Sequence, residues 1–331
     1  MSDRTIAKTL AGCTLAAAAA ILISAAPAAA QEWRGWNIHV PDYPNSRGLD
    51  RWGELVAQRS NNRIRMRTFH SAQLGQQDEA IQQLRLGAID FANFNLSPLN
   101  NLVPETQVLT LPFIFRDVSH VHKTVDGAVG DELARLIEAR LNMVVVSWFD
   151  AGARSMYTRR QVRTPADMQG LKIRVQTSDL WVDLVRALGA NATPLPFGEV
   201  YTGLQTGVID GAENNWPSYE SQRHFEVARF YATTEHSNVP EIVVVSKPRW
   251  DRASPADREI LRTAAREASA YQRQLWAERE KSSRDKVVAA GVTVTEITDR
   301  GPWQQLMAPL YEKYAGAPNM RALVDRIRAV Q

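Results

Sequence analysis

Two arginines and two asparagines stand where the ends of predicted β-strands would gather side chains around a ligand. They are Arg174 near the end of strand 171–176, Arg154 after strand 143–149, Asn95 after strand 88–94 and Asn214 after strand 208–212. In open α/β sheets, ligands bind in the crevice at the carboxyl ends of the strands. We therefore expect these four side chains to meet at one cleft.

An arginine within a strand needs an explanation, because its guanidinium keeps its proton and an unpaired charge in a dry site costs several kcal/mol. Two guanidinium groups facing a cleft would bind a carboxylate through paired, charge-assisted hydrogen bonds, and arginine does this better than lysine. The alternative is a structural ion pair, for instance between Arg174 and Asp150 or Asp183. The residues alone leave both interpretations open.

The first thirty residues have the layout of a cleavable signal peptide. Arg4 and Lys8 precede an apolar, alanine-rich stretch that ends in "APAAA", so we expect cleavage after Ala30 and export to the periplasm. "LAGC" (10–13) is similar to a lipoprotein cleavage site, but too few apolar residues precede it, and a retained membrane anchor is the other alternative. Cleavage removes Cys13, the only cysteine, and with it any disulfide or thiol chemistry.

Recognisable catalytic and metal-binding motifs are missing from the sequence. It contains no nucleophile elbow, dinucleotide-binding turn, phosphate-binding loop or zinc-protease motif. The histidines of "HVH" (120–122) would lie on different faces of a helix, and no cysteine completes a zinc set, which favours a solvated or capping role. We therefore expect no metal, no cofactor and no enzymatic activity.

The remaining chain is large enough for two lobes, at about 300 residues. Its formal net charge is +2, because the +3 of the full chain loses Asp3 and two basic residues with the leader, and so small an excess does not indicate a nucleic-acid partner. Strand candidates alternate with helical patterns, which predicts α/β lobes with largely parallel sheets. Further strand candidates are 36–40, 64–69 and 292–297, and the helical patterns are 48–59, 76–86, 119–141, 179–188, 256–290 and 303–330.

Two segments repeat one another in register, namely "EAIQQLRLGAID" (79–90) and "EVYTGLQTGVID" (199–210). Each has the pattern of a short helix that ends at a glycine and is followed by a strand. The repeat predicts one such unit in each lobe and puts Asn95 and Asn214 at nearly equivalent positions. Coincidence within a common helix–Gly–strand unit is the alternative.

The order and spacing of several segments resemble the DctP-type solute-binding proteins of tripartite ATP-independent periplasmic (TRAP) transporters. The likeness extends from about Trp36 to Val292. The segments that carry it are "SAQLGQQDEAIQQLRLGAIDF" (71–91), "LPFIF" (111–115), "DAGARSMYT" (150–158), "TPADMQGLKIRVQ" (164–176), "LGANATPLPFGEVYTGLQTGVIDGAEN" (188–214) and "HFEVARFY" (224–231). The resemblance implies a two-lobed periplasmic binding protein fold of the α/β class, with crossing strands, a ligand cleft between the lobes and a long bridging helix within 256–290.

The resemblance also implies roles for particular residues. It assigns Arg174 to the ligand carboxylate with Arg154 assisting, Asn214 to orienting the acid, Phe197 to packing against it, and Gln77 and Asn95 to its far end. Sialic-acid binders of the family carry acids at these last two places, so the amides argue for a different solute. His39 and Gln176 are further ligand-binding candidates.

The segment 212–237 is most similar to the branch that binds hexuronates and related sugar acids. D-Glucuronate or D-galacturonate would offer its carboxylate to the arginines and its hydroxyls to the amides and His39. Trp216 would either stack on the sugar or belong to the core. Glu79 and Glu199, repeated in both halves, are expected to bind backbone near helix starts, because a buried acid would repel a carboxylate.

The resemblance puts the first lobe at 31–151 plus 240–279 and the second at 152–239 plus 280–331. We expect a monomer that delivers its solute to integral-membrane permease subunits driven by an ion gradient. Delivery to a sensor is an alternative, as is a dicarboxylate, aldonate or aromatic acid as the solute. An exported carbohydrate-active enzyme that uses Glu79 and Glu199 as a carboxylate pair is the alternative from another class.

Overall fold

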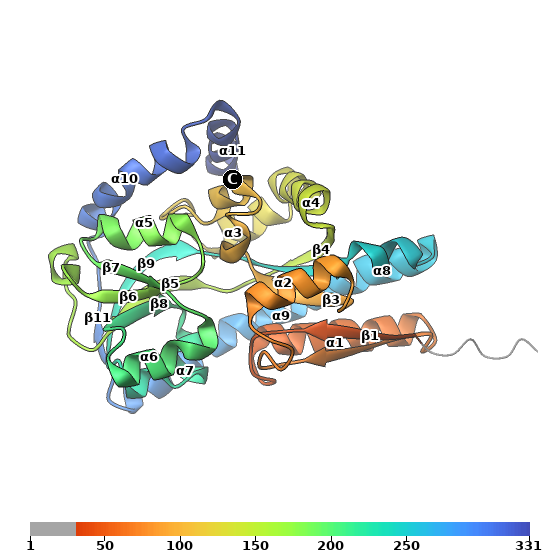
Figure 1. Ribbon diagram of the computed structural model, residues 1–331, viewed down its shortest axis with the longest axis horizontal. Helices are drawn as coiled ribbons and strands as arrows, with labels where there is room; N and C mark the ends of the chain where they lie inside the picture. Colours follow the sequence, from red (N-terminus) through yellow and green to blue (C-terminus); the bar gives the residue numbers. More distant parts are fainter. Residues whose placement is uncertain (1–30) are drawn as a thin grey trace, which may run out of the picture.

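Two mixed β-sheets lie side by side, joined by crossing strands and by one long helix (Figure 1). The computed structural model describes residues 31–331, so the predicted signal peptide and Cys13 lie outside the described residues. Within this range, no helix combines the length and the apolar character needed to cross a membrane.

The first sheet has the strand order β2-β1-β3-β10-β4. Its strands are β1 (Gln31–Trp36), β2 (Ile64–Phe69), β3 (Phe91–Asn95), β4 (Met143–Phe149) and β10 (Glu241–Ser246). β1 pairs in parallel with β2 and β3, whereas β10 runs antiparallel between β3 and β4. The order shows that β10, a strand from late in the chain, is inserted between β3 and β4.

Helices cover both faces of the first sheet, because its interior strand β10 is apolar on both sides. Val243 and Val245 of β10 belong to the core under α1 (Pro44–Arg59) and α9 (Pro255–Ala289). Ile242 and Val244 belong to the opposite core, as alternate residues of a strand must. The helices of that opposite face are α2 (Gln77–Leu86), α3 (Val118–Val125) and α4 (Ala128–Leu141), and α8 (Lys247–Arg252) follows β10.

The second sheet has the strand order β11-β9-β5-β8-β6-β7. Its strands are β5 (Ala153–Thr158), β6 (Lys172–Val175), β7 (Asn191–Pro194), β8 (Gly211–Asn214), β9 (Phe230–Asn238) and β11 (Thr293–Thr295). Its helices are α5 (Asp179–Ala187) on one face and α6 (Val200–Thr206) and α7 (Trp216–Ser221) on the other. Short 3-10 turns occur at η1 (Ser97–Leu99), η2 (Pro104–Leu109), η3 (Pro165–Met168), η4 (Phe197–Glu199) and η5 (His224–Glu226).

The chain passes between the sheets from β4 to β5, from β9 to β10 and along α9. Helix α9 contacts α1 and β4 on the first side and α7 on the second. The turn between β4 and β5 contains Gly152 at φ +60°, where an added Cβ would lie 2.7 Å from Nε1 of Trp276 in α9. Glycine is therefore required at this crossing, for its backbone conformation and for the space.

The last two helices are α10 (Gly301–Ala315) and α11 (Pro318–Ala329). α10 packs on α5, but α11 contacts α4 and η2 beside the first sheet. Nε2 of His120 in α3 also lies 2.7 Å from the carbonyl oxygen of Ile327. The lobe boundaries remain a prediction, and these contacts join residues 318–330, which we had placed in the second lobe, to the first.

The two-lobed α/β architecture and the alternation of strands and helices are confirmed, and the sheets are largely parallel as predicted, apart from one antiparallel strand in each. β10 and β5 run antiparallel to their neighbours, because each enters its sheet from the other one. The predicted strand 36–40 is wrong apart from Trp36, because β1 ends at that residue, and the patterns 119–141 and 303–330 each divide into two helices. We did not predict β5, β7, β9 or β10.

The internal repeat is a repeat in structure as well. α2 ends at Gly87 (φ 75°) and α6 at Gly207 (φ 79°), both left-handed. Oδ2 of Asp90 accepts a hydrogen bond of 2.8 Å from the backbone N–H of Arg34, and Oδ2 of Asp210 accepts one of 2.9 Å from that of Lys172. Each aspartate thus joins its unit to the neighbouring strand in the same way.

We predict that Gly152→Ala destabilises the protein more than Gly170→Ala does. Both glycines have positive φ, which costs an L-residue roughly 1–2 kcal/mol, but only the Cβ at 152 meets other atoms, since nothing lies within 4 Å of the one at 170. Urea unfolding of the two variants measures the difference. Equal losses of unfolding free energy would contradict the steric role assigned to Trp276.

Candidate functional site

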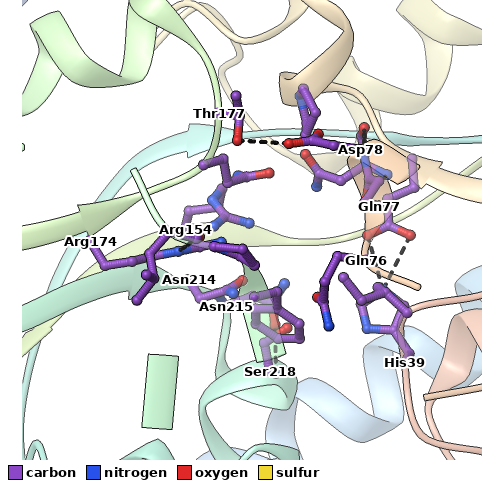
Figure 2. Close-up of a pocket in the computed structure, with 18 residues that line it drawn as sticks. His39, Gln76, Gln77, Asp78, Arg154, Arg174, Thr177, Asn214, Asn215 and Ser218 are labelled. Atoms are coloured by element: carbon purple, nitrogen blue, oxygen red, sulfur yellow. Dashed lines mark hydrogen bonds and ion pairs between the residues drawn. The ribbon is translucent and has the colours of Figure 1, made fainter. Parts of the chain in front are cut away.

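A cavity lies between the two sheets and is lined by residues from both (Figure 2). The first sheet's side contributes His39, Gln77 and Asn95, and the second contributes Arg154, Arg174, Gln176, Phe197 and Asn214. Eight of the nine predicted site residues therefore come together. The strand ends explain this, because Asn95 and Asn214 are the last residues of β3 and β8 and Arg174 lies in β6 beside them.

Arg174 is buried at 4% exposure and has no acidic partner within ion-pair distance among residues 31–331. Its Nε donates a hydrogen bond of 2.8 Å to the carbonyl oxygen of Leu195, and its guanidinium lies 5.9 Å from the ring centre of Phe197. Burial lowers the pKa of Arg174 to about 10, partly offset by the charge of Glu213, so the side chain stays protonated at neutral pH. The cavity thus holds a fixed positive charge.

The alternative ion pairs for Arg174 do not form. Oδ2 of Asp150 lies 3.0 Å from Nε2 of His122, and Oδ1 of the same carboxylate accepts from the backbone of Gly152. Asp183 instead pairs with Lys313. The structural ion pairs that we considered are therefore excluded.

Arg154 differs from the expected second free guanidinium, because it forms an ion pair with Glu213. Its Nε and Nη2 lie 2.6 Å and 2.9 Å from the two carboxylate oxygens, and Nη2 also donates to the carbonyl oxygen of Glu213. Its Nη1 has no hydrogen-bond partner among the residues that the structure describes. The two arginines and Glu213 together carry one net positive charge.

Glu213 is completely buried in β8, and its charge is stabilised locally. Burial alone would raise the pKa of its carboxyl, but the charge of Arg154 and the hydrogen bonds that Arg154 donates outweigh it and hold the pKa below its usual range. The sequence analysis did not identify Glu213. It lies 59 residues beyond Arg154, and no local pattern connects the two.

His224 lies behind the positive charge and remains neutral. Burial, reinforced by the charge of Arg174, lowers its pKa to about 3. Its Nδ1 lies 2.8 Å from the hydroxyl of Tyr157, and its ring packs edge-on against Phe197. The imidazole therefore adds no second cation to this wall of the cavity.

The amide side chains of the cavity are held by backbone groups. Oδ1 of Asn214 accepts from the N–H of Asn215 at 2.9 Å, and Oδ1 of Asn95 accepts from the N–H of Ser97 at 3.1 Å. Gln77 exchanges two hydrogen bonds with the backbone of Asn95, one of 2.8 Å from Nε2 and one of 3.2 Å to Oε1. Gln77 thus fixes the first turn of α2 on the end of β3, which leaves one Nε2 hydrogen for a ligand.

Two further amide groups of the lining lack partners. Oε1 of Gln76 on the first side and Nε2 of Gln176 on the second are buried without a hydrogen bond among the described residues. Buried polar groups without partners are unusual in proteins. Polar groups of a ligand can supply the missing hydrogen bonds.

An acid and a histidine lie on the first sheet's side of the cavity. Nε2 of His39 lies 3.1 Å and 3.3 Å from the two oxygens of Glu241, and its ring stacks on Tyr43 at 3.9 Å. Asn45 donates a further hydrogen bond of 2.7 Å to Oε2 of Glu241. We missed Glu241 because it opens β10, a strand that we did not predict; the apolar run "IVVV" that follows it was the available signal.

Hydrogen bonds across the cavity join its two sides. The hydroxyl of Thr177 donates to Oδ2 of Asp78 at 3.1 Å, as Figure 2 shows. The hydroxyl of Tyr43 lies 2.8 Å from that of Ser218. In this structure, the two sides of the cavity are therefore in direct contact with one another.

The expectation that Trp216 belongs to the ligand site is corrected, because the structure places this residue outside the cavity. Its ring stacks on Tyr231 with ring centres 3.5 Å apart, within the core on the far face of the second sheet. Of our two interpretations, the core position is the one observed. The chemistry of the cavity therefore does not include an indole ring.

The repeated glutamates and the histidine pair also lie away from the cavity lining. Glu79 accepts a hydrogen bond of 3.0 Å from the N–H of Gln76 in a capping box, as expected, whereas Glu199 is exposed and no backbone hydrogen bond of its carboxylate is found. His120 binds backbone and His122 binds Asp150. Among residues 31–331, no group of three or more acids, histidines or cysteines is arranged to hold a metal ion.

We predict that Glu213→Gln destabilises the protein strongly, because it leaves Arg154 buried without its counter-ion. Removing one partner of a buried pair costs about 3–5 kcal/mol, and urea unfolding at neutral pH measures it. Glu226→Gln, which breaks the exposed pair with Arg223, is the control and should change the unfolding free energy little. Similar losses for the two variants would contradict this prediction.

The pH dependence has a defined sign. Because the folded pKa of Glu213 lies below its unfolded value of 4.5, its stabilising contribution is present above pH 4.5 and is lost as the pH falls through the folded pKa. The difference in stability between the wild-type protein and Glu213→Gln should therefore shrink in acid.

Comparison with known proteins identifies the family. The family described as "Bacterial extracellular solute-binding protein, family 7" matches residues 37–317. A solute-binding protein of Chromohalobacter salexigens is 45% identical over 306 residues, which are 92% of this chain and 91% of that protein.

Solved structures agree with this result. A TRAP periplasmic solute-binding protein of a Bradyrhizobium species, in complex with α/β-D-galacturonate, is 46% identical, with a TM-score of 0.88 over 90% of this chain and 99% of that chain. One from Roseobacter denitrificans, with bound β-D-glucuronate, is 45% identical, with a TM-score of 0.88 over 91% of this chain and 100% of that chain. The resemblance found in the sequence is confirmed, and the chain belongs to family 7 of the bacterial extracellular solute-binding proteins.

Proposed function

We propose that this protein captures a hexuronate, D-galacturonate or D-glucuronate, in the cavity between its sheets. The observation that carries the proposal is Arg174, a buried and protonated guanidinium that lines the cavity without an acidic partner among the described residues. Relatives at 45–46% identity bind galacturonate and glucuronate. No bond is made or broken in the process.

The ligand carboxylate binds to Arg174 through the two Nη groups, since its Nε is already bonded to Leu195. Nη1 of Arg154 adds a further donor. Because Glu213 already balances one of the two arginines, a single carboxylate neutralises the arginine end of the site. This match of charge favours one carboxylate at this end of the ligand.

The rest of the ligand is uncharged, and the lining suits a polyol. Amide groups of Asn95, Asn214, Gln77 and Gln176 offer donors and acceptors to hydroxyls. Phe197 presents an apolar ring to the C–H groups of a sugar. A ligand of this kind also satisfies buried amides that lack partners.

The mechanism is capture by closure. The acid meets Arg174 in an open cleft, and the lobes, 31–151 plus 240–279 and 152–239 plus 280–331, then close on it by motion at the crossing strands and α9. Contacts such as Thr177 with Asp78 form in the closed state. The closed protein, a periplasmic monomer cleaved after Ala30, delivers the acid to the membrane permease subunits of the transporter.

We predict that Arg174→Ala weakens uronate binding by about 2–5 kcal/mol, the range for removing one partner of a buried charge pair. Arg174→Lys keeps the charge but loses the paired geometry, so it should recover only part of the affinity. Titration calorimetry with D-galacturonate and D-glucuronate measures both variants. Arg223→Ala, an exposed arginine of the second lobe, is the matched control and should bind as the wild-type protein does.

Undiminished binding by Arg174→Ala would overturn the role of this residue. A wild-type protein that shows no thermal stabilisation with either uronate would overturn the proposed solute. A ligand at a hundred times its dissociation constant adds about 2.7 kcal/mol of stability, so thermal shift is sensitive enough to decide.

A further inference from the structure

We infer that Glu241 makes the cavity selective for acids with a single carboxylate and excludes those that carry a second one at the far end. The inference rests on the proposed function, because it takes a sugar acid bound to Arg174 as its starting point. It assigns to Glu241 a role in specificity that is distinct from the grip on the carboxylate.

Glu241 is built into the most constrained part of the first sheet. It opens β10 and pairs with Asn95 of β3 on one side and Phe149 of β4 on the other. Its side chain is 4% exposed and lines the cavity. The sheet positions the backbone of Glu241, and its carboxylate is held by hydrogen bonds with His39 and Asn45.

The carboxylate keeps acceptor capacity for a ligand. Asn45 and His39 both bond Oε2, and His39 alone bonds Oε1 among the described residues. A carboxylate has about four acceptor sites in all. A ligand hydroxyl can therefore donate to Glu241, whereas a ligand carboxylate, which only accepts, cannot.

The charge of Glu241 persists at neutral pH. Burial alone would raise the pKa of Glu241, but the charge and hydrogen bond of His39, with the amides of Asn45 and Asn95, outweigh burial and lower the pKa. Asp78 places a second acid on the same side. The cavity thus has the guanidinium of Arg174 on one side and the carboxylates of Glu241 and Asp78 on the other, where Figure 2 places His39 and Asp78.

His39 supplies no free cation on this side of the cavity, because its Nε2 lies 3.1 Å and 3.3 Å from the two oxygens of Glu241. Among residues 31–331, no other basic side chain on this side lines the cavity to pair with a second carboxylate of the ligand. In a cavity shielded from water, two facing carboxylates repel strongly.

The test compares D-galacturonate with galactarate, which has the same carbon skeleton but a carboxylate at both ends. Titration calorimetry at neutral pH gives the ratio of the two affinities for the wild-type protein, Glu241→Gln and Glu241→Asp. We expect the wild-type protein to prefer galacturonate by at least about a hundredfold. Glu241→Gln should reduce this ratio at least about tenfold, whereas Glu241→Asp, which keeps the charge, should largely retain it.

Two further variants complete the design. Glu199→Gln removes an exposed acid outside the cavity and should leave the ratio unchanged. Asp78→Asn removes the second acid at the cavity and should reduce the ratio in the same direction but less. It keeps the inference testable if Glu241→Gln does not fold, as judged by its thermal unfolding.

A wild-type protein that binds galactarate within tenfold of galacturonate would overturn the inference while the proposed function stands. An unchanged ratio in Glu241→Gln, or in Asp78→Asn where the former does not fold, would assign the selectivity to shape and also overturn it. Failure of the wild-type protein to bind galacturonate and glucuronate would be a failure of the proposed function itself.

Discussion

The cavity depends on the buried positive charge of Arg174, for which residues 31–331 supply no ion-pair partner. Arg174 is almost completely buried. Among the described residues, its guanidinium donates one hydrogen bond, to the carbonyl oxygen of Leu195, and lies near the ring of Phe197. Such a charge is costly in a folded protein. On our proposal, this cost is recovered when the carboxylate of the solute binds to the guanidinium. The guanidinium is in this sense desolvated and positioned for the solute before binding.

The charges around Arg174 determine what kind of anion can bind to it favourably. Glu213 neutralises Arg154, so the site carries one positive charge where two guanidinium groups meet. His224 is kept neutral by burial and by Arg174 itself. Glu241, on the other side, adds a negative charge that a ligand hydroxyl can meet. On our proposal, the cavity is therefore selective both for the charge of its solute and for the position of that charge along the solute.

Sequence patterns predicted the residues whose position is set locally and failed for those set by distant parts of the chain. Asn95 and Asn214 were found because each directly ends a strand after a helix–Gly unit, and both units fold alike. Glu213 and Glu241 were missed because their roles arise only when strands far apart in the chain become neighbours. The antiparallel strands β5 and β10 were not predicted as strands, and periodicity would in any case predict a strand but not its direction in the sheet. Trp216 shows the limit for aromatic residues, which look alike in sequence whether they bind a ligand or fill a core.

The place of β10 in the first sheet has a consequence for how the molecule comes into being. In the sheet, β10 (241–246) lies between β3 and β4. During synthesis, β4 therefore cannot join the rest of the sheet until β10 has been made, when most of the chain exists. The helix that covers one face of that sheet, α9, comes later still. A growing chain with this topology cannot complete a stable core early, because the decisive contacts link segments far apart in the sequence. Late completion of this kind suits a polypeptide that must pass a membrane before it acquires its final shape.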